Sequence, residues 1–288
     1  MEDLWFAIAV MSLLSLIAGS VACWYLPEKQ NPQIVWITLF VVGMFVFIYY
    51  AAGHLIWATW IRSTAVIIWS NWTPLFAAAA AGTCWRLHQT PRWRRFILAG
   101  SLTLITMASV LWPFLGMVLR EQPQGGNQWE GQVAMQTFWS TCSPAAGATF
   151  LRAGGVSASE AELIPRCLTT SSGTPALGLY RGLKITANQN GRDVIAEIST
   201  IDQLMDGKQF PAILLVALPL TGVEDRRYED NWGWIPGTGH SVVALAANGD
   251  GLLIGDPAVG REYWNREELE VLWRGEMIRF AEDLPEAN

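Results

Sequence analysis

Long apolar stretches dominate the first 120 residues of this 288-residue chain, and polar residues interrupt them only briefly. A helix that crosses the hydrocarbon core of a membrane needs about 20 mainly apolar residues. Three stretches reach that length, and a fourth does so despite Asn71 and Pro74 inside it. The four predicted spans are residues 4–26, 34–52, 64–85 and 96–119. The pattern therefore predicts an N-terminal bundle of four transmembrane helices over residues 1–120.

After residue 120 the pattern changes to short periodic segments separated by turn residues. The first segments have helical spacing and the later ones alternate or run apolar, as strands do. Predicted helices are 142–154, 158–167 (capped by Ser157 with Glu160), 174–183, 201–205 and 265–275, and predicted strands are 184–185, 194–198, 211–218, 240–247, 252–256 and 277–280. Helices followed by a mainly antiparallel sheet define an α+β domain, here residues 132–288 after a Gly-, Gln- and Pro-rich linker at 121–131.

The charge distribution divides the chain at the same place. Residues 1–120 hold seven Lys or Arg and three Asp or Glu, whereas residues 121–288 hold twelve and twenty-two. The strongly acidic second part argues against a nucleic-acid partner. Its Cys and His residues are too few for a zinc site, and no other pattern calls for a cofactor. We therefore expect neither a metal nor a cofactor.

Loop charge predicts the orientation of the membrane part. Four arginines lie within residues 86–95, between the third and fourth spans. Loops rich in Lys and Arg face the cytoplasm. With four spans, the chain start and everything after residue 119 would then lie outside. We expect a multi-pass protein of a bacterial inner or plasma membrane, with its second domain on the extracytoplasmic side.

Candidate chemistry begins at Cys142, which is followed by Ser143, Pro144 and a run of small apolar residues. Proline is tolerated in the first turn of a helix, so Cys142 is predicted to stand at a helix start. The free N–H groups and the dipole at such a start favour a thiolate, which is the nucleophilic form of cysteine. Six residues upstream, Gln136 offers a side-chain N–H to an oxygen held beside the sulfur.

A partner for Cys142 follows by elimination. The chain has three histidines, and only His240 lies outside the predicted membrane part and its loops. Asp256 ends the strand that is predicted to pair with the strand of His240. A two-residue turn would point Asp256 to the other face of the hairpin, whereas an odd-length loop or a bulge places it diagonally across from His240 on the same face. We therefore predict an odd-length loop or a bulge in this hairpin. The structural alternatives are an ordinary Asp-Pro turn and an edge histidine.

These residues resemble those of the papain-like C39 family of cysteine peptidases, over residues 132–280. The motifs that carry the resemblance are Gln136-x5-Cys142 with Pro-Ala-Ala behind it, Ser159-Glu160-x-Glu-Leu163, Gly173-Thr174, Gly239-His240-Ser-Val-Val243, Gly255-Asp256-Pro257-x-x-Gly260 and Trp273-x-Gly275. The resemblance implies that Cys142 is the nucleophile, His240 the general base and acid, Asp256 the orienting residue and Gln136 the oxyanion donor. The chain departs from the family at Ser143, where glycine is usual and a side chain could narrow the site.

The sequence as a whole predicts a membrane-anchored cysteine peptidase, a thiol protease whose partners are a peptide or protein substrate and the lipid bilayer. Two alternatives stay open: an inactive peptidase fold used for binding, and a cell-wall amidase or acyltransferase with the same triad. Ser143 favours the first of these, and a Cys142–Cys167 disulfide, which an outer compartment permits, would decide for it. The sequence leaves the substrate and the oligomeric state undetermined.

Overall fold

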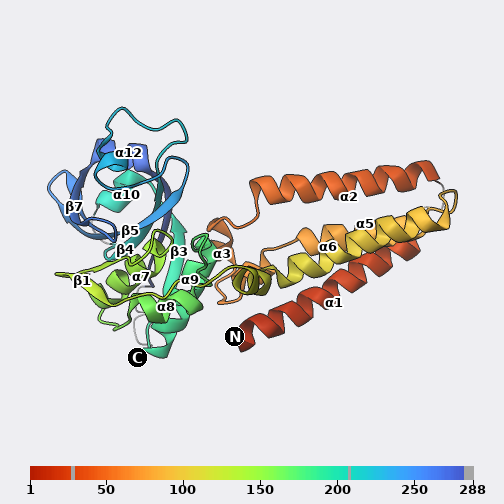
Figure 1. Cartoon of the computed structure of the whole chain (residues 1–288), viewed down its shortest axis with the longest axis horizontal. Helices are drawn as coiled ribbons and strands as arrows, with labels where there is room; N and C mark the ends of the chain where they lie inside the picture. The colour runs from red at the N-terminus through yellow and green to blue at the C-terminus, as the bar shows by residue number, and fades with distance from the viewer. Residues whose placement is uncertain (27–29, 207–208, 282–288) are drawn as a thin grey trace, which may run out of the picture. The chain divides into compact units, whose positions relative to one another are not determined.

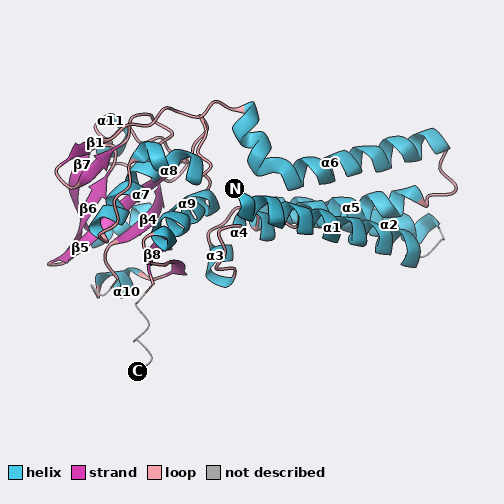
Figure 2. Cartoon of the chain, turned by 90° about the horizontal axis from the view of Figure 1, so that it is seen from below, coloured by secondary structure: helices cyan, strands magenta, loops and turns pink. Residues whose placement is uncertain are grey.

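A computed structural model describes residues 1–26, 30–206 and 209–281 of the chain, which form two compact units (Figures 1 and 2). The first unit contains residues 1–54 and 65–118. The second contains residues 55–64, with the short helix α3 (Ile56–Trp60), and the described residues from 119 onward.

Three long helices dominate the first unit: α1 (Glu2–Tyr25), α2 (Gln30–Tyr50) and α6 (Arg92–Leu119). Among the described residues these are the three helices that are long and apolar enough to cross a membrane, with α2 counted from Pro32. They match three of the predicted spans. Pro113 lies inside α6.

The remaining predicted span, residues 64–85, is not one helix. It divides into α4 (Val66–Trp69) and α5 (Thr73–Trp85), and the 13 residues of α5 extend for only about 20 Å. The Asn71 side chain causes the division, because it accepts a hydrogen bond from the Thr73 N–H and donates one to the carbonyl of Ser109. Pro74 stands in the first turn of α5, where proline fits, rather than kinking a longer helix.

The helices of this unit alternate in direction. At one end Trp5 of α1 stacks on Phe114 of α6, and at the other end Arg86 donates a hydrogen bond to the carbonyl of Cys23. Helix α5 packs against α1 so closely that a Cβ at Gly82 would lie 2.0 Å from the carbonyl oxygen of Gly19. The start of α1 and the end of α6 therefore lie at the same end of the unit.

The second unit is built on a six-stranded sheet, drawn in magenta in Figure 2, in which every neighbouring pair is antiparallel. The strand order is β3-β8-β4-β5-β6-β7. Its strands are β3 (Val194–Ile198), β4 (Ala212–Ala217), β5 (Gly239–Asn248), β6 (Gly251–Asp256), β7 (Gly260–Asn265) and β8 (Trp273–Phe280). Its helices are α7 (Cys142–Ala153), α8 (Glu160–Arg166), α9 (Ala176–Gln189), α10 (Ile201–Met205), α11 (Arg227–Asp230) and α12 (Arg266–Leu272). Three helices come before the sheet, so the predicted α+β order of this unit is confirmed.

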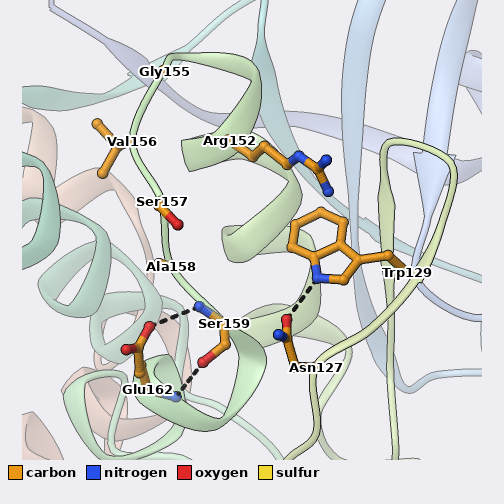
Figure 3. Close-up of a pocket in the computed structure, with 9 residues that line it drawn as sticks. All are labelled: Asn127, Trp129, Arg152, Gly155, Val156, Ser157, Ala158, Ser159 and Glu162. Carbon is orange, nitrogen blue, oxygen red and sulfur yellow. Dashed lines mark hydrogen bonds between the residues drawn. The ribbon is translucent and has the colours of Figure 1, made fainter.

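Several local predictions were wrong. The capping box of α8 is Ser159 with Glu162, not Ser157 with Glu160 (Figure 3). Residues 184–185 continue α9, which runs to Gln189, rather than forming a strand. A small hairpin, β1 (Gln128–Glu130) with β2 (Val133–Met135), begins inside the stretch predicted as a linker. Strand β7 was not predicted at all.

Glu160 holds together the segments that lead into α7. Its carboxylate is buried, and it accepts hydrogen bonds from the Gly126 N–H, the Thr137 N–H and the Thr137 hydroxyl at 2.7–2.9 Å. A buried N–H that loses its partner costs about 1–3 kcal/mol. These bonds fix the chain just before the catalytic candidate Cys142.

Replacing Glu160 with alanine is expected to lower the free energy of unfolding of the second unit by about 2–4 kcal/mol, because two buried N–H groups lose their acceptor. Pulse proteolysis of the full-length protein in urea measures this. The matched control is Glu162→Ala, which removes an exposed carboxylate from the capping box and should cost about 0.5–1 kcal/mol. Equal losses in the two variants would contradict the assigned role of Glu160.

Candidate active site

Cys142 is the first residue of α7, as predicted. Pro144 and the small residues behind it fit the first turns, and α7 packs against β5 of the sheet. The side chain is buried, and the imidazole of His240 and the backbone N–H of Ser241 both act on its thiol and favour the thiolate. The helix start therefore delivers the thiol directly to the beginning of β5.

His240 and Asp256 meet at the edge of the β5–β6 hairpin. His240 is the second residue of β5, and Asp256 is the last residue of β6. His240 Nε2 lies 2.7 Å from Asp256 Oδ1. Because Asp256 engages Nε2, Nδ1 is the ring nitrogen left for the sulfur of Cys142. Thiol, imidazole and carboxylate thus stand in series.

A β-bulge brings the two residues to the same face. The turn at Gly249 and Asp250 has two residues and pairs Asn248 with Gly251, but the register shifts between Ala244 and Ala246. Beyond the shift Val243 pairs with Gly255, so Asp256 stands diagonally across from His240. The prediction of an odd-length loop or a bulge is confirmed, and the bulge is the form it takes.

The Asp256 carboxylate is completely buried and fixed by further donors. The indole N–H of Trp234 donates to Oδ2 at 3.2 Å, and the backbone N–H of Ala258 donates to Oδ1 at 2.8 Å. The ring of Trp234 also packs on His240, with ring centroids 4.5 Å apart. The loop before β5 therefore contributes Trp234, which contacts both the carboxylate and the imidazole.

The environment favours a charged pair. Burial by itself would raise the pKa of Cys142, but the positive charge of His240 and hydrogen bonds from His240, Ser143 and Ser241 hold that pKa below its ordinary value. Burial would lower the pKa of His240, yet the charges of Asp256 and Cys142 and the hydrogen bonds to both raise it. The arrangement therefore stabilises a thiolate beside an imidazolium.

Gln136 directly follows β2, six residues before α7 begins. Its backbone N–H donates to the carbonyl of Pro257 at 2.9 Å, which ties it to the residue after Asp256. Its side-chain Oε1 is buried and has no hydrogen-bond partner among the described residues. The structure thus places Gln136 beside the segment of Asp256, and no described contact joins its side chain to the sulfur of Cys142.

A pocket of about 420 Å³ opens beside Cys142 and His240. Its other walls come from residues 172–174, from β4 and from the start of β8, where Arg274 and Glu276 bring charge to the rim. Thr238 and Gly239 also line it, so the end of the loop before His240 borders the cleft. Strand β8 reaches this site because the strand order places it next to β4, a pairing that the sequence pattern does not reveal.

All four cysteines are free. Cys167 is fully buried and its thiol faces the carbonyl of Leu179. Burial raises the pKa of Cys167 to about 12, so this thiol is unreactive at neutral pH. The Cys142–Cys167 disulfide that would have favoured an inactive fold is therefore not formed.

No family model matches the chain, and neither does any curated protein. Solved structures similar to it include the peptidase domain of Streptococcus ComA, a bi-functional ABC transporter, with 23% identity over 52% of this chain and 98% of that one and a TM-score of 0.41. A double glycine motif protease from an AMS/PCAT transporter, in complex with the leader peptide, has 19% identity over 56% and 96% and a TM-score of 0.40. A C39-like peptidase from Bacillus anthracis has 16% identity over 51% and 91% and a TM-score of 0.39.

These solved structures are C39 peptidase domains, the family that the sequence resembles. At 16–23% identity and TM-scores of 0.39–0.41, this likeness assigns no activity and no residue role to the present chain.

Proposed function

We propose that this protein is a membrane-anchored cysteine peptidase that hydrolyses peptide bonds with Cys142, His240 and Asp256. The observation that carries the proposal is the series of contacts from the sulfur through the imidazole to a fully buried carboxylate. Perturbed pKa values cluster at functional sites, and a cysteine nucleophile is activated by an adjacent imidazole and a lowered pKa.

In the proposed reaction the thiolate of Cys142 attacks the carbonyl carbon of the scissile bond and forms a C–S bond. The carbonyl π electrons move to oxygen, where the Cys142 backbone N–H and the Gln136 amide stabilise the oxyanion. His240 gives its proton to the leaving nitrogen as the C–N bond breaks. It then takes a proton from water, whose oxygen attacks the thioester, and the thiolate is regenerated. Asp256 keeps its charge throughout and holds the ring in place.

The buried, unpartnered Oε1 of Gln136 supports its proposed role indirectly. An amide whose oxygen has no donor nearby is not locked by the fold, so it can turn its N–H₂ group toward an oxyanion when substrate enters. The tie from its backbone to Pro257 keeps it at the Asp256 end of the hairpin.

We further propose that the chain crosses the membrane four times, with α4 and α5 together forming the shorter third crossing. The alternating directions of the helices and the arginine-rich stretch at residues 86–95 support this. Both ends of the first unit then face outward, and the peptidase is extracytoplasmic. Alkaline phosphatase fused after Arg120 should be active, and fused after Thr90 inactive. The opposite pattern would refute the orientation.

The rate of hydrolysis is expected to follow a bell-shaped pH profile with a broad top. The pKa of Cys142 is lowered, so the thiolate forms at a lower pH than in an ordinary cysteine. The pKa of His240 is raised, so the imidazolium persists to a higher pH than in an ordinary histidine. The reactive pair exists between the two, and the two limbs belong to the pair rather than to single residues. A profile of kcat/KM that rises only above about pH 8, as for an ordinary cysteine, would contradict the assignment.

A fluorescence-quenched peptide library tests the proposed activity on the full-length protein in detergent. The expected result is cleavage of a subset of peptides, with loss of cleavage in Cys142→Ala. Cleavage that persists unchanged in Cys142→Ala, or no cleavage by a protein whose Cys142 is shown to be a thiolate, would overturn the peptidase assignment. The second outcome would favour an amidase or acyltransferase acting on another amide.

A further inference from the structure

Ser143, the position at which this chain departs from the C39 pattern, lines the pocket beside Cys142, and its hydroxyl contacts Ser241. Its side chain is buried, and its Oγ lies 2.9 Å from Oγ of Ser241, a residue 98 positions away that directly follows His240. The two hydroxyls join the start of α7 to the start of β5, so they connect the segments that carry the nucleophile and its imidazole partner.

The same hydroxyl also faces the sulfur. Ser143 Oγ lies 3.9 Å from Sγ of Cys142, at the long end of the range for hydrogen bonds to sulfur. A serine hydroxyl has a single hydrogen. If Ser143 gives that hydrogen to the sulfur, it must accept from Ser241 across the 2.9 Å contact. In this arrangement the Ser241 hydroxyl donates to Ser143, and the Ser143 hydroxyl donates to the negatively charged sulfur of Cys142.

Resting on the proposed peptidase function, we propose that Ser241 and Ser143 form a directed pair of hydroxyls that donates one hydrogen bond to the thiolate of Cys142. Ser143 binds the thiolate, and Ser241 is a positioning residue that orients Ser143. The backbone N–H of Ser241 reaches the same sulfur, so one residue of β5 acts on it twice. The pair lines the pocket at the sulfur, where its hydroxyl groups can act on the thiolate.

Other charged groups near the sulfur do not account for this contact. The charged group beside the sulfur is His240 of β5, and Asp256 of β6 contacts His240 in turn. Arg274 and Glu276 of β8 line the same pocket and carry opposite charges. All four stay unchanged when a serine hydroxyl is removed, so a shift in the thiol titration reports on the hydroxyl pair.

The test measures the rate at which iodoacetamide alkylates Cys142 in the full-length protein in detergent, as a function of pH, with the modified peptide quantified by mass spectrometry. Ser143→Ala is expected to move the midpoint of the profile upward by about 0.5–1 pH units, as loss of one charge-assisted hydrogen bond would. Ser143→Gly should shift it the same way. Ser241→Ala should shift it less, since Ser143 keeps its own hydrogen, and the double variant should match Ser143→Ala because the two act as one unit.

The control is Ser172→Ala, which removes a serine hydroxyl from the wall of the same pocket and should leave the midpoint unchanged. Midpoints in Ser143→Ala and Ser143→Gly equal to that of the wild type, or faster alkylation in Ser143→Gly as the narrowing of the site would predict, would overturn the proposal. A wild-type midpoint near the ordinary cysteine value of about 8.5 would instead count against the peptidase assignment itself.

Discussion

Replacing Cys142 with alanine is expected to reduce peptide hydrolysis by on the order of 10⁴-fold or more, to the level of the uncatalysed background. The sulfur is the atom that forms the bond to the substrate, and no other group in the described pocket can replace it. Cys142→Ser should be nearly as inactive, because a serine hydroxyl beside this imidazole is a far weaker nucleophile than a thiolate. The measurement is kcat/KM on the best-cleaved quenched peptide.

The matched control is Cys167→Ala, which removes the other cysteine of the second unit. Its thiol is fully buried and lies against the carbonyl of Leu179, so the variant should keep its catalytic rate while losing some stability. Activity that depended on Cys167 as strongly as on Cys142 would refute the assignment of the nucleophile.

Replacing Asp256 with asparagine is expected to lower kcat/KM by about 10²–10⁴-fold while leaving the fold intact. The change removes the charge that raises the pKa of His240, so less of the thiolate–imidazolium pair exists at neutral pH. It also replaces one carboxylate oxygen with an N–H₂ group. The N–H of Trp234 or of Ala258 therefore loses its acceptor.

Asp250→Asn is the control for that variant, because it makes the same chemical change in the turn of the same hairpin. The Asp250 carboxylate is exposed and bonds only to the hydroxyl of Tyr263 among the described side chains. It should leave kcat/KM within about twofold. If Asp256→Asn behaves like Asp250→Asn, Asp256 is a structural residue and the proposed orienting role is wrong.

The placement of the reactive residues could be predicted because each depends on a local rule. Pro144 and the small residues after it predicted a helix start at Cys142. Side chains alternate between the two faces of a strand, so His240 and Asp256 share a face only if the hairpin contains one extra residue. In the structure this extra residue forms a bulge between Ala244 and Ala246. The sequence could predict that the hairpin contains an extra residue, but not the position of that residue.

The errors have long-range causes. Two Ser-x-x-Glu frames overlap before α8, and the sequence could not tell that Glu160 is drawn into the interior by Gly126 and Thr137. The direction of Ser143 was equally hidden, since it is set by Ser241 in a distant strand. The division of the third predicted span depends on a bond from Asn71 to a carbonyl of another helix.

The central claim is that Cys142 is a thiolate at neutral pH because His240 stands beside it. The most direct measurement is the ultraviolet absorbance of thiolate in the wild-type protein minus that of Cys142→Ala, followed over pH. We expect this difference to appear below the ordinary cysteine range of about 8.5 and His240→Ala to delay it to that range or above, because burial then acts on the thiol without the imidazolium. A difference that appears only near that ordinary range in the wild type, or that is unaffected by His240→Ala, would contradict it.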